Sequence, residues 1–440
     1  EGEHLTPARL MLDGARPFGD VFLLHGLGAD GGLDALVGGS PLFTRRLQTV
    51  LDAATLALLV PIAAQVTSTL WGMLAAVALS LCGAAALWVP VFPYYRLAPI
   101  LLAALFLLRK RPFLALSSAT LGVLWSLDTG TYALAGTVIA LAIQNVGPRP
   151  TFKTAMLAAV AVALPFVVLL AVRADIVRFV QDSFLIIPKA IDAVWSLPAP
   201  KVFSLAGLRY YLPPVFYGLL LALAWKRRDP RILILAVLSI VLFRTAAGRV
   251  SWSHTRFATP LLGIAFVAFV LEPLRNRIAV AILALSAVLY FEVPQNVMAG
   301  AKLAAGWPQR QNHDGLVRAL GIYTSEDNAT QLLTLKNYVD SLGPGPILDF
   351  TNERALYFLL GRKPAARCFD IPMLSAYPLL NEAMLQLQEH PPIAVILGGD
   401  PNVAVFDGVT NADRVPELAR WIDVTYPNRT QIGRFLVATR

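Results

Sequence analysis

The chain has 440 residues, of which 56% are hydrophobic without counting glycine and only 15% are charged, and its mean hydropathy is +0.61. Soluble domains average roughly 45–50% apolar residues even with glycine included, and about 25% charged residues. This composition excludes a disordered chain, a basic nucleic-acid-binding protein and an ordinary soluble enzyme.

The formal net charge of +9 is unevenly distributed. Residues 1–300 carry 24 basic and 14 acidic residues, whereas residues 301–440 carry 13 and 14. Positive charge in the hydrophobic part of a chain is typical of an inner-membrane protein, because cytoplasmic loops are enriched in lysine and arginine.

The first 46 residues are too polar to cross a bilayer, and they begin with neither a methionine nor a hydrophobic leader. We therefore expect this sequence to begin inside a longer natural chain. In the topology described below, these residues form an extracytoplasmic loop.

Ten apolar runs follow this first segment, and a membrane-spanning helix needs about 20 mostly apolar residues. The runs cover roughly residues 47–69, 70–91, 96–108, 112–127, 131–145, 154–172, 208–225, 231–246, 257–271 and 277–291. If all ten cross, one side receives 11 basic residues and two acidic ones in its turns. That side is then the cytoplasm, and the opposite side receives residues 1–46, the loop 173–207 and everything after 292.

The character of the chain changes after residue 300. A Gly-Pro-Gly-Pro turn precedes a short strand-like run at 347–350, and two further apolar runs at 392–397 and 433–438 predict buried strands. Residues 352–361 predict a helix capped by Thr351 or Asn352. Helices that alternate with strands indicate a small α/β domain.

The predicted fold is therefore an all-α polytopic membrane bundle with about ten transmembrane helices and a small C-terminal extracytoplasmic α/β domain. We expect three parts: a first extracytoplasmic loop (1–46), a transmembrane helical domain (47–292) and the C-terminal domain (293–440). The predicted location is a bacterial inner (plasma) membrane, with the C-terminal domain outside.

Ionisable residues at membrane depth are costly and are often functional. In this topology, acidic and basic groups from distant parts of the sequence map to the outer face: Glu1, Glu3, Asp20, Asp30, Asp34, Arg96, Asp128, Arg244, Arg249, His254 and Arg256. We expect them to converge on one site that has carboxylates for base chemistry and cations for an anionic group.

The segment from Glu1 to Asp20 carries a resemblance. It contains Ala8-Arg9-Leu10-Met11-Leu12 and then a Gly-Ala-Arg-Pro-Phe-Gly-Asp turn that starts at Gly14. This resembles the first outer loop of GT-C fold glycosyltransferases, such as the bacterial relatives of protein O-mannosyltransferases and the aminoarabinose transferases. In that family an Asp-Glu pair precedes an Ala-Arg-x-Met-Leu helix and a Gly-x-Pro-aromatic-x-Asp turn, which here has one extra residue.

The alignment places the glutamate of the pair on Glu1, and its aspartate would precede this sequence, as would the family's first membrane helix. A second resemblance is Gly248-Arg249-Val250-Ser251-Trp252-Ser253-His254, because some family members have Gly-Arg-x-Asp-x-x-His in a late outer loop. Ser251 stands where the aspartate would be, so the resemblance carries no acid role to that position.

The resemblance implies transfer of a sugar from a polyprenyl-phosphate donor to an acceptor hydroxyl or amine, with inversion. A carboxylate can take the proton of the acceptor, and arginine can stabilise the phosphate that leaves. The candidate bases are Glu1 first, then Asp20 and Glu3. The candidates for substrate binding are Arg249 and His254, followed by Arg96, Arg244, Asp128 and His25.

Each candidate also has a purely structural interpretation. Glu1 and Glu3 could be solvated charges, Asp20 and Asp128 could stabilise turns or cap helices, and His25 could be a packed loop histidine. The arginines and His254 could anchor the protein at lipid headgroups.

The expected partners are the polyprenyl-phosphate sugar, a glycan, lipid or protein acceptor, and the bilayer; no nucleic acid is expected. The cysteines Cys82 and Cys368 show no metal-binding spacing, so no metal ligands are assigned, and a divalent cation in the site stays an open alternative.

The alternative functions are a polytopic transporter or flippase for a lipid-linked or anionic substrate, and a membrane scaffold. Transporters usually place charges in broken helices at the bilayer midplane and have paired repeats, neither of which is evident in this sequence.

Overall fold

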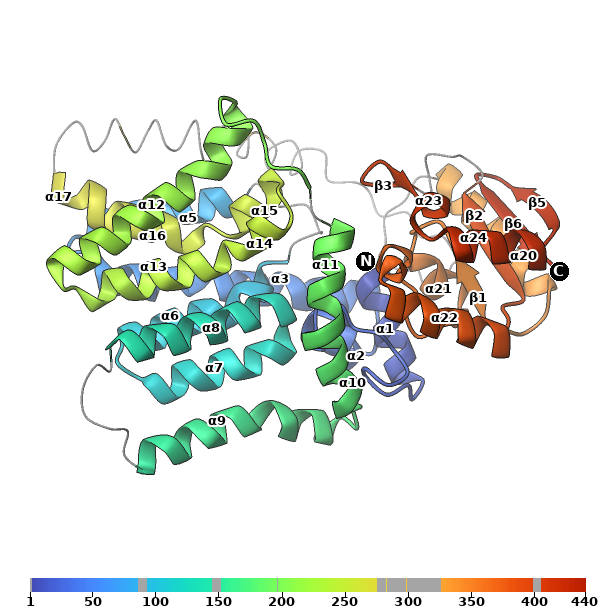
Figure 1. Ribbon diagram of the computed structural model, residues 1–440, viewed down its shortest axis with the longest axis horizontal. Coiled ribbons are helices and arrows are strands. Elements are labelled where there is room, and N and C mark those ends of the chain that lie inside the picture. The colour runs from blue at the N-terminus through green and yellow to red at the C-terminus, as the bar shows by residue number, and fades with distance from the viewer. Residues whose placement is uncertain are drawn as a thin grey trace. The chain divides into compact units, whose positions relative to one another are not determined.

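The computed structural model of the chain describes residues 2–85, 93–144, 152–195, 197–274, 326–398 and 405–440, together with Ile282 and Met298. Of these described residues 71% are helical, and a small region of strands lies near the C-terminus. The chain forms two compact units (Figure 1). One, here called the helical unit, comprises residues 48–168 and 195–307, and the other, the mixed unit, comprises 1–47, 169–194 and 308–440.

The helical unit follows the apolar runs of the sequence. Its longer helices are α3 (Pro41–Ala57, which starts in the mixed unit), α4 (Leu59–Val66), α5 (Leu70–Ala85), α6 (Ala98–Leu108), α7 (Pro112–Trp125), α8 (Leu127–Gln144), α9 (Phe152–Ala171), α12 (Leu205–Arg227) and α13 (Pro230–Leu242). The short segments are η2 (Tyr94–Leu97), α14 (Arg244–Gly248), α15 (Trp252–Phe257), α16 (Pro260–Phe266), η4 (Val267–Leu271) and α17 (Glu272–Leu274).

Each predicted apolar run up to residue 271 overlaps helix among the described residues, whereas residues 86–91, residue 145 and the run at 277–291 except Ile282 lie outside them. Among the described residues, two helical stretches are long and apolar enough to cross a bilayer, Pro41–Val66 and Pro230–Gly248. Five shorter apolar helices accompany them. The helical character of the runs is confirmed, and the ten crossings stay a prediction.

Prolines and one side-chain cap mark where several of these helices begin. Pro112, Pro230 and Pro260 stand in the first turn of their helices, where the missing amide hydrogen costs nothing. At the turn before α13, the Asp229 side chain accepts a hydrogen bond from the Arg231 amide and so caps the helix.

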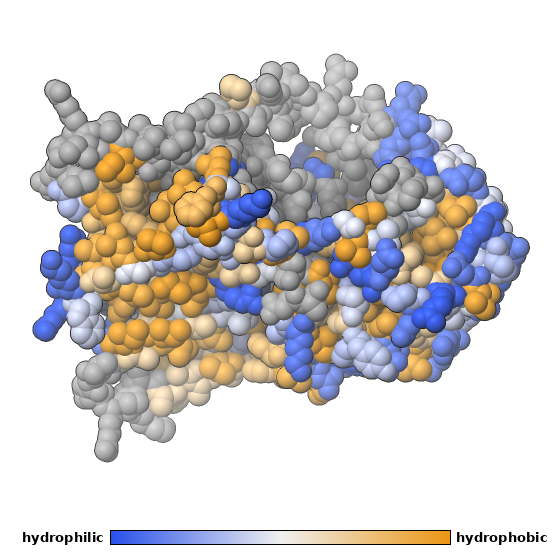
Figure 2. Space-filling model, turned by 45° about the horizontal axis from the view of Figure 1, so that its top comes forward, coloured by the Kyte–Doolittle hydropathy of each residue, from blue (hydrophilic) through white to orange (hydrophobic). Residues whose placement is uncertain are grey.

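Large apolar side chains of these helices lie both in the buried core and on the outer surface. Leu59, Ile62, Leu101, Leu238 and Leu261 are fully buried in one core cluster. Others are exposed on the outer faces of α8, α9 and α12: Val138, Ile139, Ile143, Met156, Val160, Val162, Val167, Val215, Leu219 and Trp225. Figure 2 shows a broad hydrophobic surface at the left, over the helical unit. Apolar surfaces of this extent mark contact with a membrane or a partner.

Helices α7 and α8 approach each other closely at two glycines. A Cβ built on Gly130 would lie 2.0 Å from the Gly122 carbonyl oxygen and 2.3 Å from the Val123 nitrogen. Both neighbours are backbone atoms, so no side chain can move aside. Small residues allow such backbone contact between helices in membrane proteins.

We expect Gly130→Ala to destabilise the helical unit by about 1–3 kcal/mol, the usual cost of overpacking. Gly218→Ala on α12 is the matched control, because a Cβ there meets nothing within 4 Å and alanine is favoured over glycine in a helix by up to about 1 kcal/mol. Thermal unfolding of the two variants in detergent tests the expectation. If Gly130→Ala unfolded at the same temperature as the wild type, the close contact between α7 and α8 would be contradicted.

The mixed unit combines the first segment, residues 169–194 and the C-terminal region. Its helical segments are α1 (Gly2–Leu12), η1 (Gly28–Gly32), α2 (Leu33–Leu36), α10 (Ile176–Val180), η3 (Gln181–Ile186), α11 (Ile187–Trp195), α20 (Glu326–Ser341), α21 (Ala355–Leu360), η6 (Ile371–Ser375), α22 (Tyr377–Glu389), α23 (Asn411–Arg414) and α24 (Pro416–Thr425). The sequence analysis assigned residues 169–194 to the 47–292 domain; in the structure they pack in the mixed unit.

A four-stranded sheet in the order β1-β2-β6-β5 forms the centre of the C-terminal region. Its strands are β1 (Ile347–Asp349), β2 (Ala394–Gly398), β5 (Asn428–Ile432) and β6 (Phe435–Thr439), and only the β1–β2 pair is parallel. A separate hairpin joins β3 (Val405–Phe406) to β4 (Val409–Thr410). The three predicted strands are confirmed.

The predicted helix after β1 exists but starts later than expected. It is α21, which ends at Gly361 with a φ of 69°, a conformation that glycine adopts without strain. The predicted cap was wrong: Thr351 Oγ1 instead accepts a hydrogen bond from the Glu353 amide, in a turn that precedes the helix. This turn positions Arg354 directly before α21.

Arg367 holds three segments of the mixed unit together. Its guanidinium donates to the Phe18 carbonyl (2.8 Å), to both oxygens of Asp182 (2.6 and 3.3 Å) and to both oxygens of Glu382 (2.8 and 3.0 Å). These bonds use all five donors of an arginine side chain. Asp182, on η3, is fully buried, and burial raises the pKa of its carboxyl group while the hydrogen bonds from Arg367 oppose that shift.

Candidate functional site

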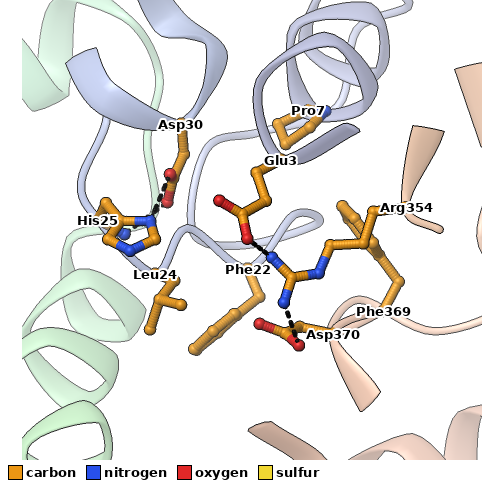
Figure 3. Close-up of a pocket in the computed structure, with 9 residues that line it drawn as sticks. All are labelled: Glu3, Pro7, Phe22, Leu24, His25, Asp30, Arg354, Phe369 and Asp370. Atoms are coloured by element: carbon orange, nitrogen blue, oxygen red, sulfur yellow. Dashed lines mark hydrogen bonds and ion pairs between the residues drawn. The ribbon is translucent and has the colours of Figure 1, made fainter. Parts of the chain in front are cut away.

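A pocket in the mixed unit is lined by residues of the first segment and the C-terminal region (Figure 3): Glu3, Pro7, Phe22, Leu24, His25, Asp30, Arg354, Phe369 and Asp370. Its empty space, including the open mouth, is about 320 Å³. Binding sites for small ligands combine apolar walls with a few convergent polar groups. The pocket has this character.

An arginine links two carboxylates in the pocket. Arg354 forms ion pairs with Glu3, on α1, and with Asp370, which precedes η6; the latter pair is 2.7 Å long. The Arg354 side chain is 11% exposed and that of Asp370 is 9% exposed, whereas that of Glu3 is 39% exposed. Glu3 is therefore the carboxylate of this set that is most accessible from solvent.

The packing of α1 explains how Glu3 comes to lie there. Helix α1 contacts α21, and Thr6 donates a hydrogen bond to the Arg354 carbonyl at 2.9 Å. Helix α1 also packs on η1, where a Cβ on Gly31 would lie 2.4 Å from the His4 carbonyl oxygen. Since Gly31 has a φ of 101°, this position requires glycine for both its conformation and its contact.

His25 and Asp30 form a second polar pair in the pocket. The His25 amide donates to Asp30 Oδ2 at 2.5 Å, and His25 Nδ1 lies 3.0 Å from Asp30 Oδ1. The neighbouring His4 bonds to the Ala29 carbonyl, and burial lowers the pKa of His4 to about 4, so that it is neutral at pH 7.

Two buried polar atoms in the pocket have no hydrogen-bond partner among the described residues: Asp370 Oδ2 and Arg354 Nε. Figure 3 shows this carboxylate oxygen on the side of Asp370 away from the bond to Arg354. Burial raises the pKa of the Asp370 carboxyl group. Since buried polar atoms are nearly always hydrogen-bonded, these two atoms indicate where a ligand could bond.

The predicted residues of the first segment have different positions. Glu3 and His25 line the pocket. Asp20 does not: it forms an ion pair with Arg16 (3.1 Å) that is about half exposed to solvent, and the hydrogen bond from Arg16 lowers the pKa of Asp20. Glu1 lies outside the described residues.

Two predicted residues of the helical unit come together. Arg96 Nη2 lies 2.7 Å from Asp128 Oδ2, and Ser126 contacts both side chains, accepting from Arg96 at 3.1 Å and donating to Asp128 at 2.8 Å. The Arg96 side chain is only 7% exposed. Asp128 already balances the charge of Arg96. The buried arginine can still hold neighbouring groups in position.

The other three predicted residues of the helical unit lie on or beside two short helices. Arg244 begins α14, Arg249 follows it, and His254 lies on α15. Ser251 caps α15, and its hydroxyl lies 2.7 Å from His254 Nδ1. Ser251 thus orients this histidine. The predicted gathering of all candidate residues at one mouth stays a prediction.

Sequence analysis missed Arg354 and Asp370. Both lie in a region whose sequence is typical of a small α/β domain, and neither belongs to a motif with a characteristic spacing. A signal was present in the position of Arg354 after a short strand, because residues that follow strands often carry function. Among the described residues, no group of three or more histidines, cysteines, aspartates and glutamates could hold a metal ion.

No protein-family model matches the chain, and no curated protein matches it either. The functional argument therefore depends on the residues and their geometry.

Proposed function

We propose that the chain is an integral-membrane glycosyltransferase of the GT-C type. It moves a sugar from a polyprenyl-phosphate carrier to a hydroxyl or amine on the extracytoplasmic face of a bacterial inner membrane. The observation that carries the proposal is the position of Glu3: a carboxylate of the first segment, one of the predicted bases, lies in a pocket beside buried polar groups.

The exposed apolar surface of the helical unit supports the membrane part of the proposal. Helix α9 exposes Met156, Val160, Val162 and Val167, which a soluble protein would cover at a gain of about 25 cal/mol per Å². The coincidence of nine predicted apolar runs with helices in the described chain supports a bundle of about ten spans, although several of these helices are short.

The proposed reaction is a single displacement. The acceptor oxygen or nitrogen attacks the anomeric carbon, the bond from that carbon to the phosphate oxygen breaks, and polyprenyl phosphate leaves with the electron pair. Glu3 takes the proton of the acceptor as the new bond forms, and the configuration at the anomeric carbon inverts. Arginine side chains stabilise the leaving phosphate by charge-assisted hydrogen bonds.

The direct test uses the full chain reconstituted in liposomes with radiolabelled polyprenyl-phosphate sugars and a panel of glycan, lipid and peptide acceptors. Release of polyprenyl phosphate that depends on an acceptor supports the proposal. Movement of the intact lipid-linked sugar across the bilayer without cleavage would instead identify a flippase and overturn it.

A further inference from the structure

The charges of the pocket restrict what it can bind. Its lining contains three carboxylates, on Glu3, Asp30 and Asp370, and one guanidinium, that of Arg354. This guanidinium already contacts two of the carboxylates. A phosphate would therefore enter a site without surplus positive charge, and like charges repel strongly where water is excluded. The pocket is unsuited to the phosphate of the donor.

The two unpartnered atoms favour an uncharged ligand that both donates and accepts hydrogen bonds. Asp370 is only 6% exposed, and its Oδ2 accepts no bond from the described residues, while Arg354 Nε lacks an acceptor among them. A ligand that donates to Asp370 and accepts from Arg354 satisfies both. A saccharide hydroxyl both donates and accepts, as serine and threonine hydroxyls do, and neighbouring hydroxyls supply both functions from one face.

The aromatic residues fit the same ligand. Phe22 and Phe369 belong to the pocket lining (Figure 3), and they provide apolar surface for the C–H groups of a sugar ring. Apolar walls with a few polar groups that fix orientation are typical of small-ligand sites.

We infer that this pocket binds the acceptor as an unphosphorylated saccharide group, with Asp370 and Arg354 bonded to its hydroxyls. The assignment of this saccharide as the acceptor rests on the proposed function, because it places the group beside Glu3. Asp370 and Arg354 bind the acceptor and exclude phosphate, and they take no part in proton transfer.

Saturation-transfer NMR on the full chain in detergent tests this inference, with glucose and glucosamine as neutral and cationic probes and glucose 6-phosphate as the anionic one. We expect glucose and glucosamine to bind and glucose 6-phosphate to bind at least tenfold more weakly. This comparison needs no variant. Absence of binding by both unphosphorylated sugars, or tighter binding of glucose 6-phosphate, would overturn the inference.

Asp370→Asn keeps the shape of the side chain and an oxygen for Arg354 but removes the negative charge. We expect about tenfold weaker binding of glucose, since hydrogen bonds to charged groups are the stronger ones, and a smaller difference between glucose and glucose 6-phosphate. Asp340→Asn is the matched control, because Asp340 also pairs with an arginine, Arg362 (2.9 Å), but is 42% exposed and outside the pocket. Unchanged sugar discrimination in Asp370→Asn would count against the inference.

The transfer assay separates the two proposals. If sugar binding is sensitive to Asp370→Asn but no transfer occurs from any donor, the glycosyltransferase proposal fails and the saccharide pocket stands. If transfer occurs and Asp370→Asn leaves the KM for the acceptor unchanged, the saccharide pocket fails and the glycosyltransferase proposal stands.

Discussion

Glu3→Gln is expected to lower the turnover number of sugar transfer by roughly 10²–10⁴-fold, the usual contribution of a general base. Glutamine has the size of glutamate and can still accept a hydrogen bond from Arg354, but it cannot take a proton at neutral pH. The KM for the polyprenyl-phosphate donor should change little, because the pocket is unsuited to phosphate. Steady-state transfer with the donor and the acceptor varied separately measures both quantities.

Glu353→Gln is the matched control for this variant. Glu353 also pairs with an arginine of the mixed unit, Arg434 at 2.8 Å, but it does not line the pocket. We expect its activity to be close to that of the wild type. Full activity in Glu3→Gln would exclude Glu3 as the base, and Glu1→Gln, measured in the same assay, shows whether the role belongs to Glu1.

The largest expected effect on stability comes from Arg367. Arg367→Met removes five hydrogen bonds and leaves the Asp182 carboxylate fully buried without its cation. Breaking one side of a buried ion pair costs about 3–5 kcal/mol. Thermal unfolding of the full chain in detergent should show a clear fall in the midpoint temperature.

A second substitution distinguishes the buried charge from lost packing. Arg367→Met combined with Asp182→Asn should unfold at a higher temperature than Arg367→Met alone, because the buried charge is gone. Arg9→Met is the control, since Arg9 pairs with Asp13 on the exposed face of α1, and such surface pairs contribute about 0–1 kcal/mol. Equal stability of Arg367→Met and Arg9→Met would contradict the role of Arg367.

The local features of this protein could be read from its sequence. Apolar runs predict the positions of helices α3 to α9, α12, α13 and α16, whereas α10 and α11 lie in the predicted loop 173–207. The strands β1, β2 and β6 follow from short β-branched and apolar runs. Glu3 was a candidate because it lies in the segment that resembles a glycosyltransferase loop, and His25 because it lies in the same predicted outer loop.

The partners of those residues could not be read in the same way. Arg367 contacts the Phe18 carbonyl across 349 positions of sequence, and the Thr6 hydroxyl contacts the Arg354 carbonyl across 348. Such pairs follow from how α1 packs on α21, and no local pattern encodes that packing. The segment 169–194 illustrates the same limit: Asp182 is buried there and pairs with Arg367, 185 positions further along the chain.

The sequence by itself determined that this is a helix-rich, hydrophobic protein with a small α/β region at its C-terminal end, because composition and periodicity act within each segment. Only the tertiary structure decided which carboxylates share a pocket. It separated Asp20, on the surface with Arg16, from Glu3, beside Arg354 and Asp370, because side-chain environment depends on contacts between segments far apart in the chain.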